Sequence, residues 1–137
     1  MTPRQPRFLQ NGTCYRIIAK AYERQSLFIE SHDYEHYLHL MQRYKMKYDI
    51  SIFAFCLMSD YVDFILQTST IEAMASFMQG VSQAYTYYFN ARYQRNGSLW
   101  NGRYRSVAIM ERGDIWDSVK YVEFNPVRAG LTESPVE

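Results

Sequence analysis

The stretch ISIFAFCLMSDYVDFILQ, residues 50–67, carries the clearest sign of the fold. Residues 50–57 are apolar on both alternating faces, as a central strand of a sheet would be. Residues 62–67 follow after a short link and are again mostly apolar. We therefore predict a hairpin of two strands in a sheet.

The segment before this hairpin predicts a strand and a helix. Residues 14–21, CYRIIAKA, alternate loosely and indicate a first strand. Ser31 can cap a helix that runs to about residue 48, because serine side chains accept hydrogen bonds from the first free backbone N–H groups of a helix.

The segment after the hairpin predicts a long helix, a short strand and a last helix. Ser69 and Glu72 have the spacing of a capping box, and apolar residues then recur at helical spacing towards residue 92. Residues 105–110 can add a strand. Asp114 can cap a third helix, which must stop near Asn125 because the next residue is proline.

The resulting order, β-α-β-β-α-β-α, predicts an α+β fold with a ferredoxin-like, split-βαβ antiparallel sheet and helices packed on one face. The length of 137 residues matches one domain, 1–137. Hydrophobic residues make up 47% and charged residues 21%, which argues against disorder. Neither a membrane-spanning stretch nor the apolar segment of a signal peptide is visible, so we expect a cytoplasmic protein.

The excess of aromatic residues, 17% with thirteen tyrosines, is the informative feature of the composition, because arginines stand beside many of them. Bases stack on aromatic rings and arginines hold phosphates, so such a mixture favours single strands and hairpin loops. The alternative is a solvated basic loop. The predicted nucleic-acid-binding residues lie at the end of the second helix and in the loop after it: Tyr87, Arg92, Arg95, Trp100, Arg103, Tyr104 and Arg105.

Five segments, in order, resemble one family, the single-tyrosine transposases of the His-hydrophobic-His superfamily, and most closely the REP-associated tyrosine transposases. They are GTCYR (12–16) with ERQ (23–25) and LF (27–28), CLM (56–58), YTYYFN (85–90), LWNGRY (99–104) and YVEFNPVRAGL (121–131). The resemblance implies cleavage of single-stranded DNA beside a hairpin through a 5′-phosphotyrosine, with Mg²⁺ or Mn²⁺ as cofactor. Whether the protein forms a homodimer stays open.

The resemblance also marks a departure at the metal site. After Cys-Leu-Met the family has Pro-Asn-His-hydrophobic-His, whereas the last three of these positions here are Tyr61, Val62 and Asp63. Residues two apart in a strand share a face, so Tyr61 and Asp63 still project together. A carboxylate suits a hard cation but a neutral phenol is a poor ligand, so we expect weak metal binding or none. The alternative is that Tyr61 packs and Asp63 hydrogen-bonds at a sheet edge.

Tyr121 matches the family's nucleophile, and Asn125 falls where the family places a further metal ligand. At about 100° per residue, both lie off the apolar stripe of the last helix on a shared line, so both can face a site. Without the resemblance, Tyr121 would be read as a packing residue and Asn125 as a helix stop.

Other candidates are weaker. His32, His36 and His39 share a helix stripe opposite the apolar one, so we expect surface residues and not a metal site. The two cysteines, Cys14 and Cys56, are expected to be reduced core thiols.

Three functions remain open. The first is a transposase acting on hairpin or single-stranded DNA, and the second is a hairpin-DNA binder that has lost catalysis. The third, an RNA binder, would need exposed aromatics on the sheet, whose candidates Phe53, Phe55 and Phe64 we expect to be buried.

Overall fold

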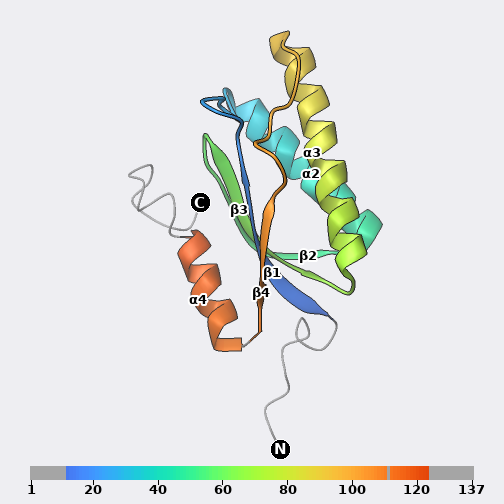
Figure 1. The fold of residues 1–137 in the computed structure, drawn as a ribbon, viewed down its shortest axis with the longest axis vertical. Helices are drawn as coiled ribbons and strands as arrows, with labels where there is room; N and C mark the ends of the chain where they lie inside the picture. The colour runs from blue at the N-terminus through green and yellow to red at the C-terminus, as the bar shows by residue number, and fades with distance from the viewer. Residues whose placement is uncertain (1–11, 111, 124–137) are drawn as a thin grey trace, which may run out of the picture.

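The computed structural model describes residues 12–110 and 112–123. All of the predicted strands and helices are present (Figure 1). In chain order they are β1 (Thr13–Lys20), α2 (Ser31–Tyr48), β2 (Ser51–Leu57), β3 (Tyr61–Thr68), α3 (Ile71–Tyr93), β4 (Arg105–Ile109) and α4 (Arg112–Glu123).

The strands form one antiparallel sheet in the order β2-β3-β1-β4. Strands β3 and β1 are central, and β2 and β4 are the edges. The α+β class and the ferredoxin-like sheet predicted from the order of elements are therefore confirmed.

The helices lie on both faces of this sheet (Figure 1). Helices α2 and α3 cover one face, against which Val62, Phe64 and Leu66 of β3 are packed. Helix α4 covers the other face, where Ile65 of β3 contacts a second apolar cluster that includes Ile115. The prediction of helices on one face is right for α2 and α3 and wrong for α4. The reason is that β3 is apolar on both faces, so each face needs a cover.

The helix starts differ by one to three residues from those predicted. Thr70, not Ser69, caps α3: its backbone is extended and its hydroxyl accepts a hydrogen bond from the Ala73 N–H at 3.0 Å. Glu30 is the N-cap of α2, and Ser31 is already helical. Asp114 lies inside the first turn of α4 and not before it. The predicted end of α4 at Asn125 lies outside the described residues.

Details of the core bear on the remaining expectations. Cys14 and Cys56 are buried free thiols, as predicted, and burial raises the pKa of Cys14 to about 11. Phe64 is buried, but Phe55 is 43% exposed on edge strand β2, so the expectation that it is buried is wrong. Among the described residues, no helix has the length and apolar character needed to cross a membrane.

Candidate functional site

The face of the sheet that α4 covers contains a buried ion pair. Arg16 of β1 donates from Nε to Asp63 Oδ1 at 3.1 Å and from Nη2 to Oδ2 at 2.6 Å. The Asp63 side chain is only 1% exposed, whereas that of Arg16 is 26% exposed. Hydrogen bonding to Asp63 raises the pKa of Arg16 despite its partial burial. Two-point pairing of this kind fixes the plane of a guanidinium.

Tyr121 lies against the same guanidinium. Helix α4 is anchored on the sheet by Ile115 and Val122, both buried, and Tyr121 is 50% exposed beside them. The Arg16 Cζ is 4.7 Å from the centroid of the Tyr121 ring, and the two side chains also interact through hydrogen bonding. Tyr121 and Asp63, predicted from segments far apart in the sequence, thus meet at Arg16.

Tyr61 shares this face of β3 and is half-buried. Burial raises the pKa of its phenol, and the nearby acidic groups, including Asp63 and Tyr121, raise it further. Tyr61 is therefore a neutral phenol at physiological pH, and a neutral phenol is a poor metal ligand.

The described residues do not fit the divalent cation that the resemblance implies. Both oxygens of Asp63 accept hydrogen bonds from Arg16, so a cation bound to them would meet a guanidinium of like charge. Within residues 12–110 and 112–123, no three His, Cys, Asp or Glu side chains lie close enough to hold an ion. The predicted ligand Asn125 lies outside the described residues.

A groove of about 1020 Å³ lies on the opposite face of the sheet, between α3 and the segment that leads into β4. Four of the predicted nucleic-acid-binding residues line it: Tyr87, Trp100, Arg103 and Tyr104. Tyr87 is 79% exposed, and Arg103 is also exposed. Trp100 is largely buried, and its Nε1–H donates to the Ser82 carbonyl at 3.2 Å, so it also holds the segment against α3. The groove offers aromatic faces and one cation at its rim.

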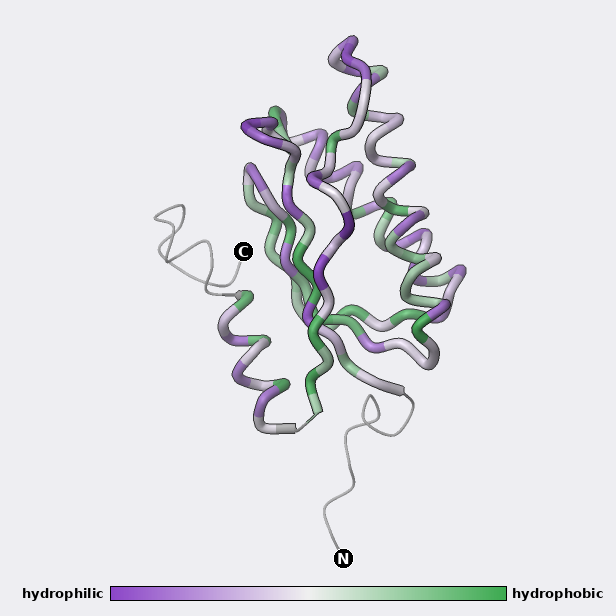
Figure 2. Tube along the Cα trace, viewed as in Figure 1, coloured by the Kyte–Doolittle hydropathy of each residue, from purple (hydrophilic) through white to green (hydrophobic). Residues whose placement is uncertain are grey.

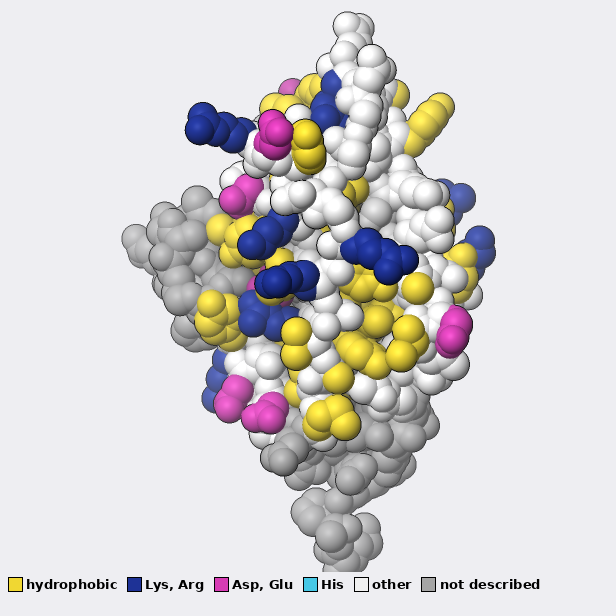
Figure 3. Space-filling view, viewed as in Figure 1, with side chains coloured by type: hydrophobic (Ala, Val, Ile, Leu, Met, Phe, Trp, Pro, Cys, Tyr) yellow, Lys and Arg dark blue, Asp and Glu magenta, His cyan; other side chains and the backbone are white. Residues whose placement is uncertain are grey.

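Edge strand β4 separates this groove from the Tyr121 side. Ser106 lines the groove, whereas Arg105 is paired with Ile18 and shares the face of Arg16. Lys20 lies on that face too, because it is paired with Tyr61. Strand β4 is hydrophilic at its start and hydrophobic towards its end (Figure 2). Around the middle of the molecule, Lys and Arg side chains gather mainly on the side towards α4 (Figure 3).

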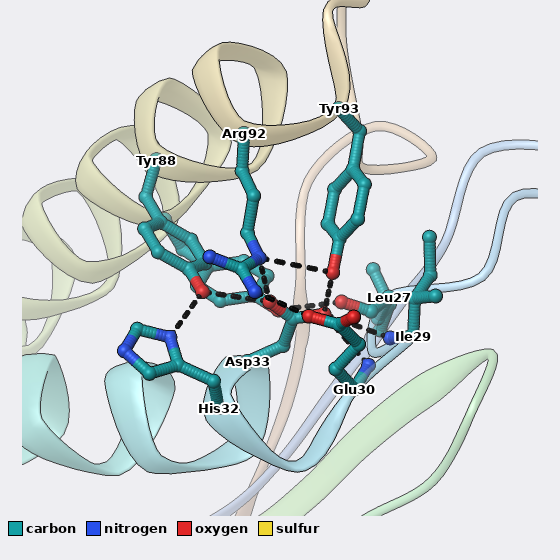
Figure 4. A network of polar contacts seen from close by, with 9 residues as sticks. Leu27, Ile29, Glu30, His32, Asp33, Tyr88, Arg92 and Tyr93 are labelled. Atoms are coloured by element: carbon teal, nitrogen blue, oxygen red, sulfur yellow. Dashed lines mark hydrogen bonds and ion pairs between the residues drawn. The ribbon is translucent and has the colours of Figure 1, made fainter.

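The remaining two predicted nucleic-acid-binding residues are engaged by other residues of the protein. Arg92 is ion-paired with Glu30 and lies 3.5 Å from the Asp33 carboxylate (Figure 4). Arg95 donates to Asn90 Oδ1 at 2.6 Å and to the Ser98 carbonyl at 3.2 Å, which closes the turn after α3. Neither lines the groove.

Asp33 is the centre of the network in Figure 4 and is completely buried. Tyr88 and Tyr93 of α3 donate hydroxyl hydrogen bonds to it at 2.7 and 2.5 Å. The backbone N–H groups of Ile29 and Glu30 donate to it as well. Burial alone would raise the pKa of Asp33, but these hydrogen bonds lower it below the ordinary value. The network joins the start of α2 to the end of α3.

The histidines of α2 lie beside this network. His36 is stacked on Tyr88 with ring centroids 3.8 Å apart, and His32 Nδ1 is 2.8 Å from the Tyr88 hydroxyl. His32 and His39 are exposed, as predicted, whereas His36 is half-buried. The expectation that all three face solvent is thus wrong for His36, because Tyr88 of α3 covers its ring.

Sequence reasoning missed Arg16, Lys20 and Asp33 as functional or structural centres. A signal for Arg16 existed. Arg16 is a cation in an apolar strand, and Asp63 is an anion in another apolar strand. Charged residues in buried strands are usually paired with each other. The pairing itself depends on strand order and register, which the sequence pattern does not report.

The comparisons with known proteins bear on the family and the fold of the chain. The model of a family described as IS200-like transposases matches residues 10–125. The fold is similar to that of a REP-associated tyrosine transposase bound to a REP hairpin, with a TM-score of 0.77, 17% identity, and coverage of 98% of this chain and 78% of that one. It is also similar to a putative transposase from Deinococcus radiodurans R1, with a TM-score of 0.59, 16% identity, and coverage of 88% and 96%. No curated protein matches the chain.

Proposed function

The chain belongs to the family of IS200-like transposases, and from this membership we propose that it binds hairpin or single-stranded DNA and cleaves and joins it through Tyr121. The similar structure of a REP-associated transposase holds a REP hairpin, which supports a DNA hairpin as the ligand. The observation that carries the proposal is the meeting of Tyr121, half exposed, with the Arg16 guanidinium on a basic face of the sheet.

The proposed reaction is an attack of the Tyr121 hydroxyl oxygen on a DNA phosphorus. A tyrosine–phosphate bond forms, the bond from phosphorus to the 3′ oxygen breaks, and the phenolic proton ends on that oxygen. The products are a 5′-phosphotyrosine and a free 3′-hydroxyl. Joining is the reverse attack by a 3′-hydroxyl. Covalent attack divides one difficult step into two easier ones.

The groove and the Tyr121 face can serve one DNA ligand, because only edge strand β4 lies between them. Bases can stack on Tyr87 and Tyr104 in the groove, and Arg103 and Arg105 can hold phosphates on the two sides of β4. Stacking contributes on the order of 1–3 kcal/mol per base and does not depend strongly on sequence. This arrangement favours a hairpin whose unpaired nucleotides cross β4.

The resemblance carries an expectation of Mg²⁺ or Mn²⁺, which the described residues do not fit. Asp63 is the one predicted ligand among them with a charged oxygen, and Arg16 holds both of its oxygens. We therefore assign no step of the reaction to a metal ion.

A second candidate function is hairpin binding without cleavage, as in a regulator derived from a transposase. It is favoured by the same ion pair and by the neutral phenol of Tyr61, because both stand where the family has its metal-binding histidines.

The test is incubation with labelled single-stranded DNA hairpins, with and without Mg²⁺ or Mn²⁺, followed by denaturing separation. We expect a covalent protein–DNA adduct that Tyr121→Phe abolishes, while hairpin affinity stays within about twofold of wild type, because the substitution removes only one hydroxyl. Tyr48→Phe, on α2, is the matched control and should form the adduct normally.

Each outcome decides between the candidates. Binding without an adduct in any condition would establish the second function. An adduct that persists in Tyr121→Phe would refute the role of Tyr121, and a wild-type protein that does not bind hairpins would refute both functions.

A further inference from the structure

Arg16 has hydrogen-bonding capacity beyond its pair with Asp63. An arginine carries five N–H groups in a planar fork. Asp63 accepts from Nε and from Nη2, which is one edge of that fork. The rest of the guanidinium lies by Tyr121, and the Arg16 side chain is 26% exposed. The buried Asp63 carboxylate thus fixes one edge of the Arg16 guanidinium, and the partly exposed remainder lies on the Tyr121 side, where a ligand can reach it.

We propose that Arg16, oriented by Asp63, binds the DNA phosphate that Tyr121 attacks and takes the place of the divalent cation. This inference rests on the proposed function and adds to it that phosphate binding needs no metal. A guanidinium matches the geometry of two phosphate oxygens. Its charge also stabilises the charge that develops on those oxygens during attack.

The charges around Arg16 support a phosphate as its further partner. Lys20 and Arg105 share its face of the sheet by strand register, so this face carries three cations and the buried carboxylate of Asp63. Hydrogen bonding to Asp63 raises the pKa of Arg16, so the guanidinium stays charged and transfers no proton. Asp63 is a positioning residue here, because it acts only through Arg16.

A purely structural pair would look different in one respect. Ion pairs that serve only the core are enclosed, and apolar residues of similar size often replace them without loss of stability. This pair has one buried member, while the other is partly exposed beside Tyr121. That asymmetry is expected of an arginine that is held on one side and binds a ligand on the other.

The test measures DNA affinity, so it does not depend on cleavage. The probe is the labelled hairpin with single-stranded tails that wild type binds most tightly, and its fluorescence anisotropy is followed in EDTA and then with added Mn²⁺. We expect wild type to bind in EDTA, with less than about a twofold change on adding Mn²⁺. Arg16→Gln should lose about tenfold in affinity or more in both conditions, since a charge-assisted contact is lost.

Further variants separate phosphate binding from folding. Arg16→Gln leaves the Asp63 charge buried without its partner, which can destabilise the fold. The double variant Arg16→Gln with Asp63→Asn replaces the ion pair by a neutral hydrogen-bonded pair. It should lose as much DNA affinity as Arg16→Gln alone. Arg16→Lys keeps the charge without the fork and should lie between wild type and Arg16→Gln. The slope of affinity against salt should fall by about one phosphate contact in Arg16→Gln. The control is Arg43→Gln, at an exposed position of α2, which should bind the hairpin as wild type does.

Two results would overturn the inference while leaving the proposed function intact. One is that the folded double variant binds the hairpin in EDTA as tightly as wild type does. The other is a rise in wild-type affinity on adding Mn²⁺ that Asp63→Asn removes, which would make Asp63 a metal ligand. Failure of the wild type to bind any hairpin would instead overturn the proposed function and this inference with it.

Discussion

The Asp33 side chain stabilises the contact between α2 and α3. It accepts from two tyrosine hydroxyls and two backbone N–H groups while fully buried. We expect Asp33→Asn to lower the free energy of unfolding by about 3 kcal/mol, because the new amide N–H₂ would face donors. Urea denaturation measures this, with Glu35→Gln, exposed on the same helix, as the control.

The stabilisation that the Asp33 charge contributes should depend on pH. The pKa of Asp33 is lowered in the folded protein, so its contribution is fully present above its unfolded pKa, which is about 3.9. That contribution is lost as the pH falls through the lower, folded pKa. The difference in stability between wild type and Asp33→Asn should therefore shrink below about pH 4. A difference that is constant from neutral pH to acid would show that the charge of Asp33 is not what stabilises the network.

At the scale of elements, α2 and α3 are in close contact where Gly80 meets Tyr44. A Cβ at position 80 would lie 2.6 Å from Tyr44 Cε1 and 2.7 Å from Cδ1. We expect Gly80→Ala to destabilise the protein by about 1–2 kcal/mol, because the overlap outweighs the roughly 1 kcal/mol that alanine gains over glycine inside a helix. Thermal or urea unfolding measures the change.

Making Gly80→Ala in a Tyr44→Ala variant separates the steric overlap with the ring from the higher helix propensity of alanine. With the ring removed, Gly80→Ala should stabilise by about 1 kcal/mol, since only helix propensity remains. The sign of the effect should therefore reverse between the two backgrounds. Equal effects in both would mean that Tyr44 moves aside and that the close approach of α2 and α3 does not depend on Gly80.

At the scale of the whole molecule, edge strand β4 lies between the groove and the Tyr121 face. If one hairpin crosses β4, Arg103 on the groove side and Arg105 on the other side hold different phosphates of the same ligand. We expect Arg103→Gln and Arg105→Gln each to weaken hairpin binding and to reduce its salt slope by about one, with additive effects in the double variant. Anisotropy titrations at several salt concentrations measure this.

The outcome depends on where the DNA lies. Loss of affinity in Arg103→Gln alone would place the DNA only in the groove, and loss in Arg105→Gln alone would place it only on the Tyr121 face. Either result would contradict a ligand that crosses β4. Both variants should unfold as wild type does, because both side chains are exposed.

Much of the fold followed from local pattern. Two apolar runs around residue 60 predicted β2 and β3, and helical spacing of apolar residues predicted α2 and α3 to within about a residue at most ends. These features are set by residues near one another in the chain, and burial of one stripe or face dictates the period. The caps were less accurate, because Thr70 and Glu30 took the places expected of Ser69 and Ser31. Serine and threonine are both favoured caps, so the local pattern does not decide between Ser69 and Thr70.

The sequence by itself determined the order of elements, the resemblance to single-tyrosine transposases, and the presence of tyrosine at position 61 and aspartate at position 63. Only the tertiary structure decided that α4 lies on the face opposite α2 and α3, that Arg92 and Arg95 are bound by other residues of the protein, and that Arg16 joins Asp63 to Tyr121. Arg16 and Asp63 are 47 residues apart in the chain. The physical reason is that a strand's own pattern shows which of its residues share a face, whereas the sheet's order and register decide what each of them meets across it.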